Sequence, residues 1–294
     1  MKFKKIGLVL GGGGGKGSYQ VGVYKALKEF GLADKIACIS GTSIGSLNLT
    51  LFANQDVEKA EKIWTNLKRT NVLTFNNVKE YLKLSNFSIF SRKGMLNIFK
   101  DNINLEEVSK SKLPLFVTAY NEEKDISTTF QINNMVPEKI IKCIMASSAI
   151  PKVFQSVNID GENYSDGYVK DNVPVSILNK IGCDLIFVIP LSEYGAPYEG
   201  MYPDTYIIDF KDKIFDNVGT WEGTLGFDKE IAKRRIDLGY KNAIKIITYL
   251  NSIGFFETGI KKRFHYFMLR IFNKIPNYKK YYSLKDTKNK INSK

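Results

Sequence analysis

Short apolar runs alternate with amphipathic stretches along the start of the chain. Residues 6–10 form an apolar run that ends in glycine, which predicts a short buried strand. Residues 18–30 repeat apolar positions on one helical face and stop at Gly31, a suitable C-terminal cap. A second strand is expected over 35–40, followed by a helix with few polar positions over 43–53. This order predicts an α/β protein, a three-layer α/β/α fold with a mainly parallel central sheet.

The alternation continues through the later part of the chain. A hairpin that turns at Asp160–Gly161 is expected within residues 157–164. Residues 55–112 are largely polar and helical in pattern, with Asn-rich breaks, and we interpret them as a cap or insertion. The remaining predicted elements are strands over 113–120, 126–132, 185–190 and 205–210 and helices over 137–147 and 228–250.

Composition adds a division of the chain to this picture. Hydrophobic residues make up 44% of the 294 positions, enough for a substantial core. The net charge is +13, and residues 261–294 hold eleven Lys or Arg and one acid, so that segment carries +10 and the first 260 residues carry +3. We therefore divide the chain into a catalytic domain over 1–255, which includes the insertion, and a basic tail over 256–294.

The basic tail has the pattern of an amphipathic helix. An apolar stripe flanked by basic residues suits a helix that lies on an anionic membrane surface. A helix packed on the domain with solvated charges is the alternative. Nucleic acid is the least favoured partner because no nucleic-acid fold signature accompanies the charge. The positions on the apolar face are Ile260, Phe264, Phe267, Met268, Ile271, Phe272 and Ile275.

Cysteine usage and the N-terminal pattern indicate a cytoplasmic protein. Cys38, Cys143 and Cys183 are odd in number and each lies in an apolar run, so we expect buried thiols rather than a disulfide framework. The apolar run over 6–10 is too short for a signal peptide, and no window reaches the ~18 apolar residues of a membrane span. We expect a cytoplasmic location with peripheral contact to a membrane.

A run of glycines at 11–15 and 17 separates the first strand from the first helix. Such a loop can turn its backbone N–H groups toward an anion, either a phosphate or an oxyanion. The P-loop pattern fails because Leu10 and Gly17 stand at its two ends. The dinucleotide fingerprint matches Gly12, Gly14 and Gly17, but the second strand ends at Ser40 without the acid that would bind ribose, which disfavours a nucleotide.

The segment Gly41-Thr42-Ser43-Ile44-Gly45 matches the G-x-S-x-G nucleophile elbow, directly after a predicted strand and before a helix. Small residues at Gly41 and Gly45 would avoid clashes at the tight turn. Ser43 needs a base, and the single histidine, His265, lies in the basic tail. A hydrolase built on Ser43 is therefore expected to use a carboxylate.

Asp166 and Gly167 on their own would indicate an ordinary turn. Together with the glycine loop and the elbow, however, they resemble the patatin-like phospholipase family. Residues 146–151 and 172–174 are similar to the family's segments before and after the aspartate. Tyr168 and Gly15 depart from the pattern: Tyr168 stands where a small residue is usual and could narrow the site, and Gly15 replaces a common alanine.

The resemblance implies a serine acyl-hydrolase that cleaves lipid esters through a Ser43–Asp166 dyad and an acyl-enzyme. It implies an oxyanion hole formed by the N–H groups of Gly12, Gly13 and Gly14, and no metal or cofactor. Lys16 could contact a phosphate headgroup or be a solvated lysine at the end of the loop. The alternatives are a non-catalytic lipid- or nucleotide-binding module and an acyltransferase that uses the same acyl-enzyme.

Overall fold

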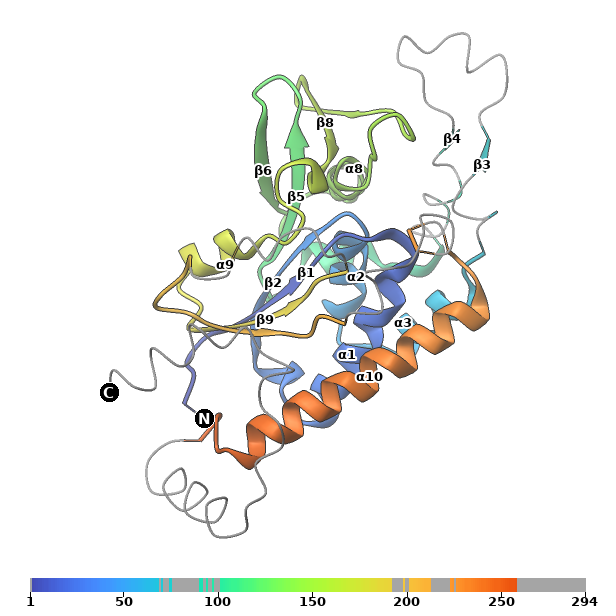
Figure 1. Ribbon diagram of the computed structural model, residues 1–294. Coiled ribbons are helices and arrows are strands. Elements are labelled where there is room, and N and C mark those ends of the chain that lie inside the picture. The colour runs from blue at the N-terminus through green and yellow to red at the C-terminus, as the bar shows by residue number, and fades with distance from the viewer. Residues whose placement is uncertain are drawn as a thin grey trace.

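Figure 1 shows the computed structural model of the chain. It describes residues 2–68, 70, 74–75, 90–91, 94, 97, 101–191, 198, 201–212, 223–224 and 226–257. The basic tail from residue 258 onward, with His265, lies outside the described residues, as does most of the predicted insertion between 71 and 100.

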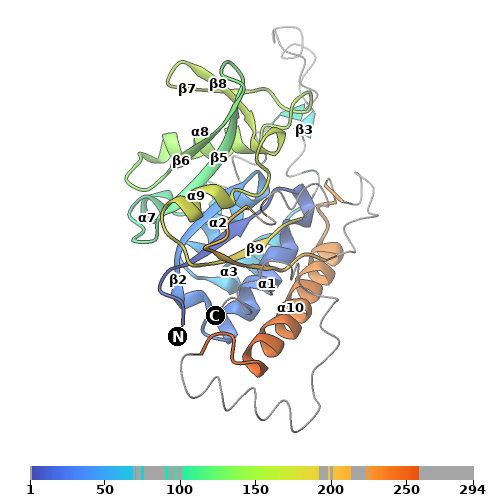
Figure 2. The same cartoon turned by 60° about the vertical axis from the view of Figure 1, so that its left-hand side comes forward.

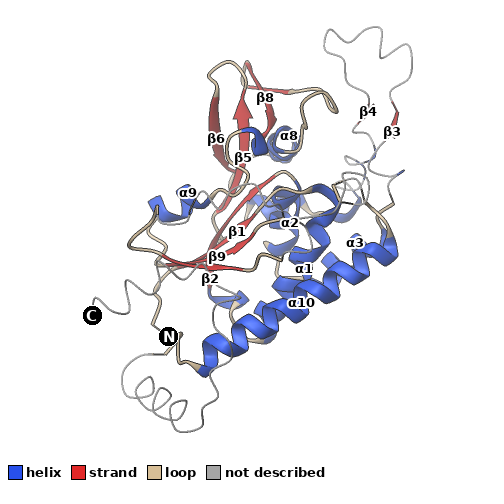
Figure 3. Cartoon of the chain, viewed as in Figure 1, coloured by secondary structure: helices blue, strands red, loops and turns tan. Residues whose placement is uncertain are grey.

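An eight-stranded sheet forms the centre of the molecule, in the order β10-β9-β1-β2-β5-β8-β7, with β6 pairing to β5. The pairs from β10 through β5 are parallel, whereas β5–β6, β5–β8 and β7–β8 are antiparallel. The prediction of a mainly parallel sheet is thus confirmed, with an antiparallel end (Figure 3). The strands are β1 Ile6–Leu10, β2 Ile36–Thr42, β5 Leu115–Asn121, β6 Ile126–Gln131, β7 Val157–Ile159, β8 Glu162–Asp166, β9 Leu185–Ile189 and β10 Tyr206–Asp209, with a separate ladder of β3 Thr74–Phe75 and β4 Phe90–Ser91.

Helices cover both faces of the sheet, unequally. Alternate residues of β1 enter two cores: Leu8 belongs to the core that also holds side chains of α1, α2 and α10, whereas Val9 belongs to the core that holds side chains of α9. Figures 1 and 2 show these helices around the central strands. This confirms the predicted layering, although the sequence pattern missed α9, whose six residues are too short to show a helical period. The helices are α1 Ser18–Glu29, α2 Ile44–Phe52, α3 Val57–Asn66, α7 Leu105–Ser109, α8 Pro137–Ser147, α9 Val175–Lys180 and α10 Lys229–Ser252.

The long helix α10 lies against α1, on the face of the sheet that α1 and α2 cover (Figure 1). The two backbones meet at a pair of glycines. A Cβ on Gly22 would run into the carbonyl oxygen of Ile236, and a Cβ on Gly239 would run into that of Tyr19. This close packing holds α1 in place, and α1 follows the glycine loop directly in the chain.

The three cysteines are buried thiols, as the sequence predicts. All three cysteines are free and buried, and the Sγ atoms of Cys38 and Cys183 lie 3.2 Å apart between β2 and the start of β9. Within the described ranges, no helix combines the length and the apolar character needed to cross a bilayer.

Candidate active site

Ser43 stands at a sharp turn between β2 and α2, as the elbow motif predicts. Its backbone has φ 56° and ψ −124°, a conformation that costs a non-glycine residue roughly 1–3 kcal/mol. The turn leaves no room for side chains on either side. A Cβ on Gly41 would lie 2.5 Å from the carbonyl oxygen of Gly45, and a Cβ on Gly45 would run into that of Leu10. The two glycines therefore permit the strained turn that exposes the Ser43 hydroxyl to the pocket.

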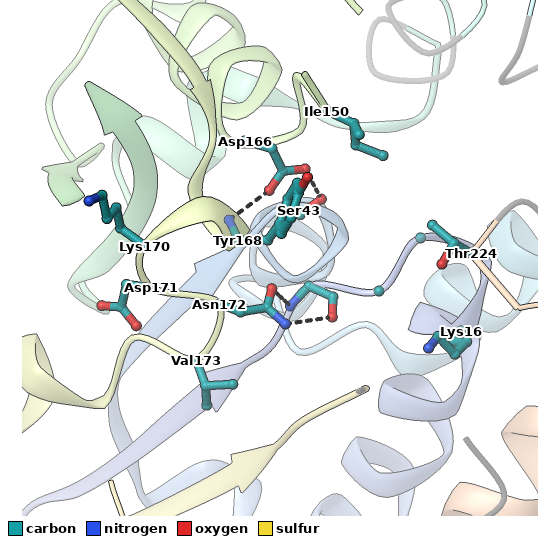
Figure 4. Close-up of a pocket in the computed structure, with 13 residues that line it drawn as sticks. Lys16, Ser43, Ile150, Asp166, Tyr168, Lys170, Asp171, Asn172, Val173 and Thr224 are labelled. Atoms are coloured by element: carbon teal, nitrogen blue, oxygen red, sulfur yellow. Dashed lines mark hydrogen bonds between the residues drawn. The ribbon is translucent and has the colours of Figure 1, made fainter. Parts of the chain in front are cut away.

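Asp166 lies at the end of β8 and contacts the serine directly. The Ser43 hydroxyl donates a hydrogen bond to Asp166 Oδ2 at 2.6 Å, and the N–H of Tyr168 donates to Oδ1 at 3.0 Å (Figure 4). Burial raises the pKa of Asp166 to about 7, although both hydrogen bonds oppose that shift. The carboxylate is therefore poised to take up a proton near neutral pH.

The sheet brings these two residues together although they are 123 positions apart. Strand β2 pairs with the first half of β5, up to Thr42 opposite Thr118. Strand β8 pairs with the second half, from Asp166 opposite Ala119, and runs the other way. Since β6 occupies the other edge of β5, β2 and β8 share one edge, and their C-terminal ends meet there. Ser43 directly follows the end of β2 and Asp166 is the last residue of β8, so both residues lie at this meeting point.

The glycine loop lines the same pocket, but its three predicted oxyanion donors are not equivalent. The N–H of Gly12 points to Asn172, with both the backbone oxygen and Oδ1 at 3.2 Å, and Asn172 Nδ2 donates to the Gly12 oxygen at 3.3 Å (Figure 4). The N–H groups of Gly13 and Gly14 donate to no other group within the described part of the chain. The predicted oxyanion role thus fits Gly13 and Gly14 better than Gly12.

A buried network of polar side chains holds the backbone of the glycine loop. Gln20 Nε2 donates to the Gly11 oxygen at 2.9 Å, and Asn48 Nδ2 donates to the Gly17 oxygen at 2.9 Å. Asn48 also donates to Gln20 Oε1 at 2.8 Å and accepts from Trp64 Nε1 at 2.8 Å. Because a buried polar group without a partner is costly, this satisfied network favours a single loop conformation. It binds carbonyl oxygens at both ends of the loop.

Ser43, Asp166 and the three glycines share a cavity of about 570 Å³. Ile150 and Val173 supply apolar walls, and Lys16 and Thr224 lie across the glycine loop from Asp166 (Figure 4). Lys16 is buried, rather than solvated as the alternative interpretation had it, and its contact with a headgroup stays a prediction. The cavity therefore places Ser43 and Asp166 beside apolar walls.

Two further charged groups, Lys170 and Asp171, line the cavity beside Ser43 and Asp166. Lys170 forms an ion pair with Asp125 at 3.0 Å, and burial raises the pKa of Asp171.

No group of three or more His, Cys, Asp or Glu among the described residues is arranged to hold a metal ion.

Sequence reasoning missed the roles of Asn172, Gln20 and Asn48. Each contacts the glycine loop through a side-chain amide, yet none lies in the loop itself. The one available signal was that Gln20 and Asn48 each stand between two apolar residues of a predicted helix, since buried amide groups need internal partners.

The fold and this site define an α/β protein with a buried serine–aspartate pair beside a glycine loop. The model of the patatin-like phospholipase family matches residues 8–179. The chain therefore belongs to the patatin-like phospholipase family, which confirms the resemblance inferred from the motifs.

Curated relatives are similar at moderate identity. The patatin-like phospholipase domain-containing protein ZK370.4 of Caenorhabditis elegans is 28% identical over 214 residues, or 67% of this chain and 15% of that protein. Lysophospholipase nte1 of Aspergillus terreus is 27% identical over 63% of this chain and 12% of that protein. Probable lipid hydrolase 463L of Invertebrate iridescent virus 6 is 27% identical over 59% of this chain and 63% of that protein. The chain thus spans less than a sixth of the first two relatives.

Two solved structures are also similar. VipD from Legionella pneumophila has a TM-score of 0.47 and 15% identity, covering 83% of this chain and 67% of that one. The type III effector protein ExoU has a TM-score of 0.46 and 14% identity, covering 83% of this chain and 53% of that one.

Proposed function

We propose that this protein is a lipid acyl-hydrolase that cleaves carboxylic esters through a Ser43–Asp166 dyad. The observation that carries the proposal is the 2.6 Å hydrogen bond from the Ser43 hydroxyl to Asp166, inside a cavity lined by the glycine loop. Family membership and the names of the relatives, which include lysophospholipases and a lipid hydrolase, support a lipid ester as substrate.

In the first half of the reaction, Ser43 Oγ attacks the ester carbonyl carbon and its proton passes to Asp166 Oδ2. The tetrahedral intermediate then collapses, Asp166 returns the proton to the departing alkoxide, and the acyl group stays on Ser43. In the second half, Asp166 takes a proton from water, which attacks the acyl-enzyme. The fatty acid leaves and the serine regains its proton.

The N–H groups of Gly13 and Gly14 are the proposed donors to the oxyanion of both tetrahedral intermediates. Backbone donors fixed in advance cost no reorganisation when the charge develops, and losing one typically costs ~3 kcal/mol in the transition state. The N-terminus of α2, which begins at Ile44 directly after the nucleophile, adds a favourable dipole.

Hydrolysis of a short-chain p-nitrophenyl ester, run beside labelled phosphatidylcholine and phosphatidylglycerol vesicles, tests the proposal. Wild type should hydrolyse the soluble ester, and Ser43→Ala and Asp166→Asn should not. The rate should fall as the pH drops below about 7, because a protonated Asp166 cannot accept the serine proton. Activity that survives in Ser43→Ala would show that another residue is the nucleophile.

A further inference from the structure

One hydroxyl group outside the dyad bridges the point where β2 leaves the sheet. Ser147 is the last residue of α8 and is fully buried. Its hydroxyl donates to the carbonyl oxygen of Thr118 at 2.6 Å and accepts from the backbone N–H of Ser43 at 2.8 Å. Because a carbonyl can only accept and an N–H can only donate, both bonds have a fixed direction.

The position of this hydroxyl follows from the register of the sheet. Ile39 lies opposite Leu115 and donates its N–H to the oxygen of Pro114. In a parallel ladder the same bond recurs every second residue, so a continued ladder would have Ser43 donate to Thr118. Ser147 stands between these two groups instead, with one bond to each. The Ser147 hydroxyl therefore takes the place of the direct backbone bond that a continued β2–β5 ladder would form between Ser43 and Thr118.

The same helix end also contacts the other member of the dyad. Two residues after Ser147, the oxygen of Ala149 accepts the backbone N–H of Asp166 at 3.0 Å. Residues 147–149 thus bond the backbone of both dyad residues, which lie at the ends of β2 and β8, two strands that do not pair with each other. This short segment sets the spacing across the gap between the ends of β2 and β8.

We propose that Ser147 is a positioning residue, which holds the Ser43 backbone out of the β2–β5 ladder so that its hydroxyl reaches Asp166. The inference deepens the proposed function and rests on it. Ser147 touches no substrate in this scheme, and it acts through the backbone of the nucleophile. Its loss should lower the rate of the chemical step and leave substrate binding nearly unchanged.

Ser148 offers a matched control at the next position. It is also buried, and its hydroxyl bonds the oxygen of Ile144 within its own helix at 2.9 Å. Among the described contacts none joins Ser148 to Ser43 or Asp166. Both Ser→Ala changes remove one buried hydroxyl from the end of α8, and only Ser147→Ala removes the bridge to the nucleophile.

The test compares kcat, KM and melting temperature for Ser147→Ala, Ser147→Cys and Ser148→Ala on a soluble p-nitrophenyl ester. A fluorophosphonate probe measures the labelling rate of Ser43 in the same proteins. We expect kcat and labelling to fall roughly tenfold to hundredfold in Ser147→Ala, with KM within about twofold of wild type. Ser147→Cys should recover part of the rate, because a thiol is a weak donor and acceptor of similar shape. Ser148→Ala should keep the wild-type kcat.

The outcomes separate this inference from the proposed function. If Ser43→Ala retains hydrolysis, the proposed function fails and the inference fails with it. If Ser43→Ala is inactive but Ser147→Ala matches Ser148→Ala in kcat and labelling, the inference alone is overturned. Should Ser147→Ala not fold, folded Ser147→Cys decides the question, because a wild-type kcat in that variant overturns the positioning role and a reduced kcat at unchanged KM supports it.

Discussion

The parallel and antiparallel parts of the sheet place the two dyad candidates in different ways. In the parallel part, neighbours in the chain form the turn: β2 ends, Gly41 and Gly45 permit it, and α2 begins immediately after Ser43, while the Ser147 hydroxyl accepts the Ser43 N–H. In the antiparallel part, Asp166 depends on β8 pairing with the second half of β5 in one register. A slip of one residue there would turn the carboxylate to the other face of the sheet.

The turn that presents Ser43 is thus largely a local feature, whereas the placement of Asp166 is a long-range one. Substitutions at Gly41 and Gly45 should act mainly on the geometry of Ser43. The properties of Asp166 come instead from what the whole fold packs around it, above all the burial that raises its pKa.

The largest effect should come from the dyad itself. We expect Ser43→Ala and Asp166→Asn each to lower kcat on a soluble ester by at least about a thousandfold, and the double variant to be no slower than Ser43→Ala, because the two groups act as one unit. Asp160→Asn is the matched control, since Asp160 is an exposed carboxylate at the hairpin turn. A kcat for Asp166→Asn equal to that of Asp160→Asn would remove Asp166 from the mechanism.

The burial of Asp166 should appear as a pH dependence of stability. Its pKa is raised from 3.8 to about 7, so the folded protein keeps a proton that the unfolded chain has already lost in this window. The contribution of Asp166 to stability is therefore fully present below about pH 4 and is lost as the pH rises to about 7, a loss of about 4 kcal/mol. Chemical denaturation across this range should show the loss in wild type relative to Asp166→Asn. Parallel curves would mean that Asp166 is not buried in a dry environment.

The Asn172 clamp, meaning the hydrogen bonds between the Asn172 side chain and Gly12, should affect kcat less than Ser43 and Asp166 do. Asn172→Ala removes the side-chain bonds to the N–H and oxygen of Gly12. We expect kcat to fall roughly tenfold as the neighbouring oxyanion donors lose their fixed geometry. Asn133→Ala is the control, because Asn133 makes comparable amide bonds to the backbone at Leu115 and Ser111, away from the pocket. Equal kcat in the two variants would rule out a catalytic role for the clamp.

The basic tail should have the smallest effect on the chemistry. Deletion of residues 260–294 is expected to weaken binding to anionic vesicles, with each basic residue near such a surface contributing about 1 kcal/mol, and to leave hydrolysis of a soluble ester unchanged. Vesicle sedimentation and the ester assay measure the two properties separately. Equal vesicle binding with and without the tail would exclude it as the membrane contact.

Much of the fold could be predicted because its segments carry strong periodic patterns. The helix over Pro137–Ser147 was predicted to the residue, and the hairpin was placed at Asp160–Gly161. The short α9 was not, because six residues do not complete two helical turns. Beyond that hairpin, the antiparallel pairing of β6 and β8 with β5 was also not specified, since a strand's pattern indicates burial and not the direction of its partner.

Local sequence patterns alone identified three segments of the candidate site: the glycine loop, the elbow around Ser43 and the Asp166-Gly167 pair. Each is a short run of residues that its own local pattern identifies. The tertiary fold determined which of these groups meet and how deeply each is buried. It joined β2 and β8 on one edge of β5, placed Ser147 between the two strands, and directed Asn172 to Gly12. It also buried Asp166 and so raised its pKa. These features depend on contacts between residues far apart in the chain, which no local pattern records.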